Sequence, residues 1–149
     1  MAAPQPPSPR RLHLEKLLPS PPERVFGAFT DSEQLRGWWG PVGFTVQSLE
    51  FDVVEGTDYR ITMQPPDGDV FRIRGTFRAL EVPRRVTFTF VYEEPDPDDQ
   101  ETLVTLRFDP EDGGTRLVLD QEPFTTAARW ELHRQGWTET LERLEQSLT

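Results

Sequence analysis

The fold is decided by a stretch near the start of the chain, which reads Phe29-Thr30-Asp31-Ser32-Glu33-Gln34-Leu35-Arg36-Gly37-Trp38-Trp39-Gly40-Pro41. Its spacing predicts a short helix capped by Asp31 that ends at two adjacent tryptophans followed by Gly-Pro. Tryptophan is rarely left fully exposed, so such a pair either fills a core or lines the mouth of a cavity. We expect one indole in the core and the other, partly exposed, at a glycine-rich corner that gates ligand access.

The residues on either side of this stretch predict a first strand, another short helix and a series of further strands. Residues 11–18 alternate weakly and indicate a strand. Ser20 is expected to cap the next helix, with Glu23 completing a capping box. Beyond residue 44 the apolar period changes to two and turn residues recur, which indicates five or six antiparallel strands. On the first of these, Gln47 is expected to share a face with Leu49.

The last predicted element is a long helix from about Thr126 to Leu148, capped by Thr125 or Thr126. Apolar residues at helical spacing give it a stripe that includes Trp137. The apolar inner face of a meander must be covered, and only this helix is long enough to do so. The sequence therefore predicts an α+β fold: a curved antiparallel sheet of about six to seven strands around a long C-terminal helix, with two short helices after the first strand.

Composition limits the partners of this chain. Its 149 residues carry a formal net charge of −10, which argues against nucleic acids and anionic membrane surfaces. The chain has no cysteine, so disulfides and thiolate chemistry are excluded. No apolar run approaches the length of a membrane span and no signal-peptide pattern is present, so we expect a cytoplasmic location without a membrane partner. Residues 1–10 are expected to form a disordered Pro-rich arm, and residues 11–149 a single domain.

Several short motifs, spread over residues 11–148, carry a family resemblance. They include Pro22-Glu23-Arg24-Val25-Phe26, Gly75-Thr76-Phe77, Pro83-Arg84-Arg85-Val86, Gly113-Gly114-Thr115-Arg116-Leu117 and Gly136-Trp137, together with the corner at 35–41. On these residues the chain resembles the Aha-type family, homologues of the activator of a heat-shock-protein ATPase, within the START-like (SRPBCC) superfamily. The resemblance implies the helix-grip fold with a hydrophobic cavity between sheet and helix. It implies no shared reaction, because relatives include carriers, cyclases and co-chaperone domains.

The residues expected to line this cavity come from the corner, the inner face of the sheet and the last helix. They are Trp38, Trp39, Phe44, Tyr59, Ile61, Phe71, Ile73, Phe77, Phe88, Phe90, Leu106, Trp130, His133 and Trp137. The function expected from them is binding of a small hydrophobic or aromatic molecule without obligatory catalysis. We expect no catalytic residue, metal ion or cofactor, because the chain lacks a nucleophile motif, a phosphate loop and a set of metal ligands.

Two alternative functions remain open. A cyclase or hydratase would use a pocket acid and base, with His133 and Tyr59 as the polar pair, although a satisfied core histidine is the more frequent situation. A co-chaperone or stress-response domain would instead present a protein-binding surface, with a chaperone or a second copy of the chain as partner.

Two groups of charged residues are expected on the surface. Arg60 and Arg74 are expected to lie opposite each other on the outer face of the sheet. The acidic run 93–101 is interpreted as a solubilising loop.

Overall fold

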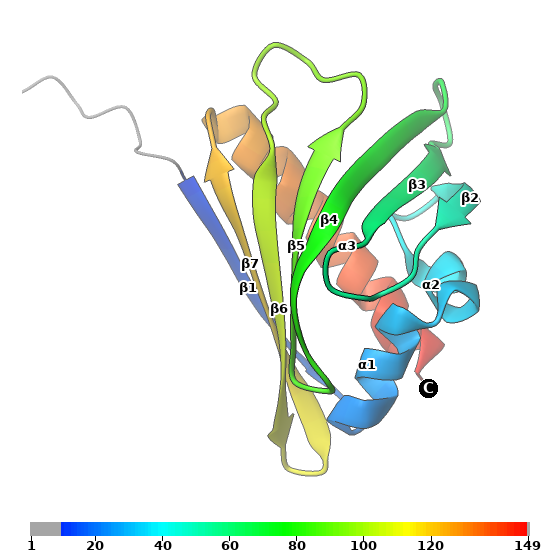
Figure 1. The fold of residues 1–149 in the computed structure, drawn as a ribbon, viewed down its shortest axis with the longest axis vertical. Coiled ribbons are helices and arrows are strands. Elements are labelled where there is room, and N and C mark those ends of the chain that lie inside the picture. Colours follow the sequence, from blue (N-terminus) through cyan, green and yellow to red (C-terminus); the bar gives the residue numbers. More distant parts are fainter. Residues whose placement is uncertain (1–9, 149) are drawn as a thin grey trace, which may run out of the picture.

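A computed structural model describes residues 10–148 as one antiparallel sheet, two short helices and a long C-terminal helix (Figure 1). Strand β1 (Arg10–Leu18) precedes helices α1 (Pro22–Thr30) and α2 (Ser32–Trp38). The remaining strands are β2 (Thr45–Glu50), β3 (Asp58–Gln64), β4 (Phe71–Glu81), β5 (Arg85–Tyr92), β6 (Thr102–Glu111) and β7 (Gly114–Phe124), and helix α3 follows them over Ala127–Ser147. The predicted helix-grip fold is confirmed. The predicted arm lies outside the described residues, except for Arg10, which begins β1.

The seven strands form a single sheet in the order β1-β7-β6-β5-β4-β3-β2. Each strand from β2 to β7 pairs with its neighbour in sequence, and β1 closes the sheet beside β7. Arg60 lies opposite Arg74, as the alternation predicted. Helix α3 crosses one face of the sheet, packs against β1 and β7, and also contacts α2 (Figure 1).

Two of the three predicted helix caps are present. The Asp31 carboxylate accepts a hydrogen bond from the Glu33 N–H at 3.0 Å, and the Thr126 hydroxyl accepts one from the Arg129 N–H at 3.1 Å. The prediction for Ser20 was wrong: α1 is preceded by Pro21 and has no side-chain cap. Its first residue is a proline, which has no N–H to satisfy, so a cap contributes less there.

The prediction that Gln47 of β2 shares a face with Leu49 was also wrong. A bulge between residues 46 and 48 of β2 interrupts the alternation. Val46 is therefore buried and Gln47 is exposed, while Leu49 still packs against the core. A bulge adds one residue to a strand, which turns every side chain before it to the opposite face.

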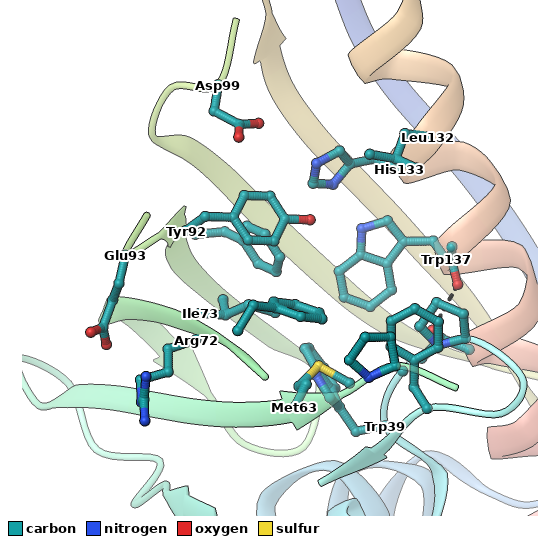
Figure 2. A pocket seen from close by; sticks show the side chains of 18 of the residues that line it. Trp39, Met63, Arg72, Ile73, Tyr92, Glu93, Asp99, Leu132, His133 and Trp137 are labelled. Atoms are coloured by element: carbon teal, nitrogen blue, oxygen red, sulfur yellow. Dashed lines mark hydrogen bonds between the residues drawn. The ribbon is translucent and has the colours of Figure 1, made fainter. Parts of the chain in front are cut away.

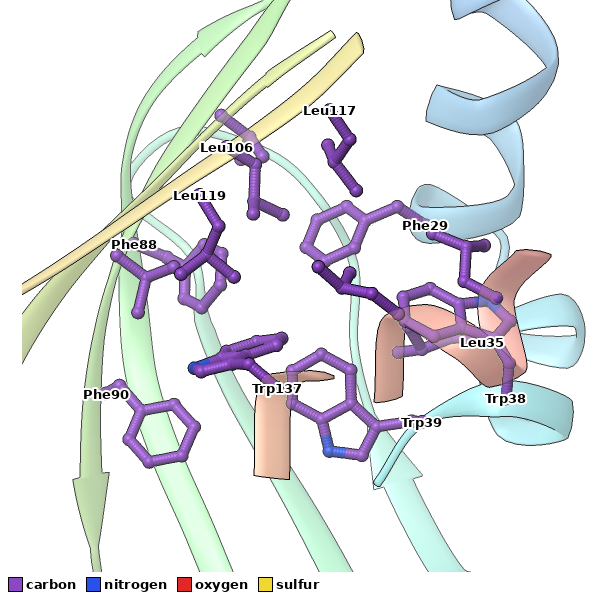
Figure 3. Packing of buried hydrophobic residues seen from close by; sticks show 14 of the residues in the cluster. Phe29, Leu35, Trp38, Trp39, Phe88, Phe90, Leu106, Leu117, Leu119 and Trp137 are labelled. Atoms are coloured by element: carbon purple, nitrogen blue, oxygen red, sulfur yellow. The ribbon is translucent and has the colours of Figure 1, made fainter. Parts of the chain in front are cut away.

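The core lies where α1 and α2 meet the inner face of the sheet (Figure 3). Phe29 of α1 stacks on Phe88 of β5 with ring centroids 5.8 Å apart, and it also contacts the Trp38 ring of α2. Buried leucines complete this cluster, including Leu35, Leu106, Leu117 and Leu119. Helix α1 thus covers this part of the sheet directly, where it contacts β6 and β7, and the cavity lies farther along β5.

Candidate functional site

A cavity of about 380 Å³ lies between helix α3 and strands β3, β4 and β5 (Figure 2). The segment 39–44 after α2 and the loop 93–99 after β5 complete its wall. Its volume falls within the range of pockets that hold small molecules. The residues of α3 that line it recur at helical spacing: Arg129, Leu132, His133, Gly136, Trp137 and Thr140.

Most of the cavity wall is aromatic or aliphatic. The indoles of Trp39 and Trp137 meet edge to face with their ring centroids 5.4 Å apart. Phe44 and Phe71 form a second edge-to-face pair at 6.1 Å. The other apolar lining residues are Pro41, Met63, Pro65, Ile73, Phe90 and Leu132. These aromatic pairs support one another without a ligand, so an apolar molecule would meet walls that are already formed.

His133 and Tyr92 are the polar groups at the end of the cavity near the β5–β6 loop. The imidazole of His133 is 8% exposed and touches the rings of Phe90, Tyr92 and Phe124. Neither His133 ring nitrogen nor the Tyr92 hydroxyl has a hydrogen-bond partner within residues 10–148. Figure 2 shows the imidazole pointing from α3 toward Tyr92, whose hydroxyl points back toward the helix. Both groups are therefore free to bind a ligand.

The two groups are uncharged at neutral pH. Burial, together with the nearby charge of Arg129, lowers the pKa of His133 to about 4. Burial raises the pKa of Tyr92 above its ordinary value, and the charge of Asp99 adds to this effect. A neutral imidazole can accept one hydrogen bond and donate another, and a phenol can do the same.

The acidic loop has a structural role that the sequence interpretation missed. Arg129 of α3 pairs through Nε with Asp98 at 3.0 Å, through Nη1 with Asp99 at 3.1 Å, and through Nη2 with Asp96. Hydrogen bonds from Arg129 and Thr126 hold the pKa of Asp98 below its ordinary value. The loop is thus fastened to the first turn of α3, where it closes one end of the cavity.

Seven of the predicted lining residues lie on the cavity wall: Trp39, Phe44, Phe71, Ile73, Phe90, His133 and Trp137. The other seven do not: Trp38, Tyr59, Ile61, Phe77, Phe88, Leu106 and Trp130. Six of these lie in the closed core, because they face α1, α2 or their own neighbours in the sheet. Trp130 is half-buried on another side of α3, where its indole N–H donates to the carbonyl of Arg11 at 3.1 Å.

The predicted polar pair of His133 and Tyr59 is not brought together. The Tyr59 hydroxyl is buried and donates to the Thr89 carbonyl at 2.6 Å, and Tyr59 does not line the cavity. Burial raises the pKa of Tyr59 well above its ordinary value. Tyr92 is the tyrosine that shares the cavity with His133. The sequence prediction missed Tyr92 and Met63 as lining residues. Both could have been found from the alternation, because Tyr92 is in step with Phe88 and Phe90, and Met63 is in step with Ile61.

The tryptophan corner differs from its prediction in one respect. Trp38 packs in the core and donates its indole N–H to the Ala28 carbonyl at 3.0 Å, whereas Trp39 lines the cavity. Both indoles are nevertheless buried, with 2% and 4% of their surface exposed. The expectation of a partly exposed indole was therefore wrong.

Arg143 of α3 holds this corner in place. Its Nη1 lies 2.9 Å from the Gly40 carbonyl oxygen, and the carbonyl oxygens of Trp39, Pro41 and Phe44 lie within 3.3 Å. Its Nη2 donates to the Gly37 carbonyl at 3.3 Å. One guanidinium thus satisfies several backbone acceptors of a segment that belongs to no helix or strand. This arrangement favours a fixed corner over a hinge.

Replacing Arg143 with methionine is expected to lower the free energy of unfolding by about 2 kcal/mol, because it removes charged donors from partly buried carbonyls. Arg134→Met is the matched control, since Arg134 on the same helix pairs through its side chain with Glu131 in the adjacent turn. Its replacement should change stability by less than about 0.5 kcal/mol. Urea titration of both variants measures the difference. Equal losses would show that the corner does not depend on Arg143.

Residues 10–148 contain no helix that combines the length and apolar character needed to cross a membrane. Within the same range, no three histidine, aspartate or glutamate side chains are grouped as ligands for a metal ion.

Comparison with known proteins gives a family and a fold. Residues 19–149 match the sequence model of the family described as Activator of Hsp90 ATPase homolog 1-like protein. The crystal structure of a protein from Chromobacterium violaceum is 27% identical, with a TM-score of 0.83 over 91% of this chain and 94% of that one. The crystal structure of an AHSA1 protein from Silicibacter pomeroyi is 28% identical, with a TM-score of 0.82 over 93% of this chain and 97% of that one. Comparison with curated proteins gave no match.

Proposed function

The chain belongs to the Activator of Hsp90 ATPase homolog 1-like family, and we propose that it binds a small hydrophobic or aromatic molecule in the cavity between α3 and the sheet. The observation that carries this proposal is the cavity itself, whose wall contains Trp39, Phe90 and Trp137. Burial of an aromatic ligand against these side chains contributes about 25 cal/mol for each Å² of apolar surface removed from water.

Binding in this proposal does not require a reaction. An acid–base mechanism needs two groups within reach of one substrate atom, and the predicted partner Tyr59 is committed to the Thr89 carbonyl. The low pKa of His133 also makes it a weak base at neutral pH. The co-chaperone alternative is supported by the family description alone, without a specific surface that argues for it.

Titration with the neutral fluorescent probe N-phenyl-1-naphthylamine tests the proposal. Saturable fluorescence enhancement is expected for the unmodified chain. Ile73→Trp should weaken binding at least about tenfold, because the larger side chain occupies the cavity. Arg74→Trp is the matched control, because the adjacent residue of β4 points to the outer face, and its affinity should stay within about twofold.

Melting temperatures decide whether a weak signal reflects a filled cavity or an unfolded protein. Phe90→Trp, at another position on the wall, provides a second cavity-filling variant if Ile73→Trp does not fold. The absence of saturable binding to the unmodified, folded chain would contradict the proposed function. Equal losses in Ile73→Trp and Arg74→Trp would place the probe elsewhere on the protein.

A further inference from the structure

The charged residues around the cavity give its mouth a negative balance. Four carboxylates, Glu93, Glu94, Asp96 and Asp99, lie among the lining residues, and we call them the acidic rim. The two lining cations are Arg72 and Arg129, so the charged lining residues sum to −2. The rim partners outside the lining, Arg60 for Glu93 and Asp98 for Arg129, add one charge of each sign and leave this balance unchanged.

Neither cation offers an unpaired charge to an anionic group at the His133 end of the cavity. Each of the three side-chain nitrogens of Arg129 pairs with a different carboxylate, and the side chain is only 14% exposed. Arg72 lies beside Glu93, on the side of the cavity opposite α3 (Figure 2). An anion in the cavity would therefore meet no unpaired positive charge near His133.

His133 is an independent indication that a polar ligand group belongs at this end. More than nine-tenths of its surface is buried, it faces the cavity, and its ring nitrogens have no partner among the described residues. The ring nitrogens are not sealed inside the protein but open to the cavity, so a ligand with a matching polar group can form hydrogen bonds that none of the described residues provides. The Tyr92 hydroxyl faces the same space from the sheet.

We infer that the ligand is a neutral or cationic aromatic amphiphile, with its aromatic part against Trp39 and Trp137 and its polar end, a hydroxyl or a protonated amine, at His133, Tyr92 and the acidic rim. This inference rests on the proposed function and specifies its substrate class. A carboxylate at the same position would lose its water, gain no counter-charge and be repelled by the rim. A protonated amine would also lose its water, but it would donate to His133 or Tyr92 and be attracted by the carboxylates around Arg129, which outnumber the charge of that side chain three to one.

Three probes that share one naphthalene ring system test the inference at neutral pH and about 20 mM salt, where screening is weak. They are 2-naphthalenemethanol, 2-naphthylmethylamine and 2-naphthylacetic acid, each used to displace N-phenyl-1-naphthylamine. The alcohol and the amine should displace the dye, and the acid should bind at least about tenfold more weakly than the alcohol. An acid that binds as tightly as the alcohol, while the dye still binds, would overturn the inference and leave the proposed function standing. Failure of the dye and all three probes to bind would overturn both.

Two variants test whether the selectivity among the probes arises at the His133 end of the cavity. Glu94→Gln should reduce the advantage of the amine over the acid by about two- to threefold, whereas Glu142→Gln, the same charge change on an α3 residue outside the cavity, should not. His133→Phe should weaken the alcohol about fivefold, the value of one hydrogen bond, and leave 2-methylnaphthalene nearly unchanged. Unchanged selectivity in both Glu94→Gln and His133→Phe would place charge discrimination outside this end of the cavity and overturn the inference.

Discussion

Replacing Trp137 with alanine is expected to lower the free energy of unfolding by about 3–5 kcal/mol, because it removes a large buried side chain and leaves a hole beside Trp39. The indole is 6% exposed, and its N–H donates to the Gln121 side-chain oxygen at 2.7 Å. Gln121 is fully buried and in turn donates to the Thr102 hydroxyl at 2.8 Å. The alanine variant therefore loses packing and also leaves a buried amide oxygen without its donor.

Trp130→Ala is the matched control for this experiment. Trp130 lies on the same helix, is only half-buried and makes one hydrogen bond, to the Arg11 carbonyl. Its replacement should lower stability by about 1 kcal/mol. Thermal and urea unfolding of both variants give the comparison. Similar losses for the two tryptophans would mean that Trp137 is not the core contact that joins α3 to the sheet.

Acidification is expected to destabilise the protein through His133 by about 3 kcal/mol between roughly pH 6.5 and 4. The ordinary pKa of a histidine side chain is 6.5, and in the folded protein that of His133 is about 4. In this pH range the unfolded chain binds a proton that the folded chain does not, so stability falls as the pH falls. Arg129 on the same helix and Tyr92 on β5 lie near the imidazole, and neither changes charge in this range. Asp98 and Asp99 of the β5–β6 loop line a small pocket together with His133, so the effect of the imidazole must be separated from that of carboxylates.

Comparison of the unmodified chain with His133→Phe isolates this effect from the titration of carboxylates. The difference in unfolding free energy between neutral pH and pH 4 should be about 3 kcal/mol smaller in the variant. His13→Phe is the control, because His13 is exposed and its pKa is raised by hydrogen bonds to Glu15 and Asp120. This control should keep the acid sensitivity that comes from His133. Identical pH dependence in His133→Phe and the unmodified chain would show that the imidazole is not buried in its neutral form.

Local pattern was enough to predict the order of the elements and several of their ends. The change from a period of about 3.6 to a period of two marks the helices and strands, and it depends only on residues near one another in the chain. Asp31 was predictable as a cap, and Thr126 as one of two candidates beside Thr125, because a cap bonds to its own helix two or three residues away. The facing pair Arg60 and Arg74 followed from the alternation of the two strands and the turn between them. The bulge in β2 was not predicted, since nothing near Gln47 marks it.

The cavity, in contrast, was decided by tertiary structure. Alternation assigned Phe88 and Phe90 to the same inner face, but Phe88 stacks on Phe29 in the core and Phe90 borders the cavity. The difference arises because α1 packs on the sheet at Phe88 and does not extend to Phe90. The periodicity of a sequence shows which face of a strand is apolar, but it does not show how far that face lies from a helix. The partners of Arg129 and Arg143 lie about 30 and 100 residues away in the chain, so their roles depend on the folded arrangement. The sequence by itself determined which faces are apolar, and only the packing of helices against the curved sheet decided which part of those faces stays open to a ligand.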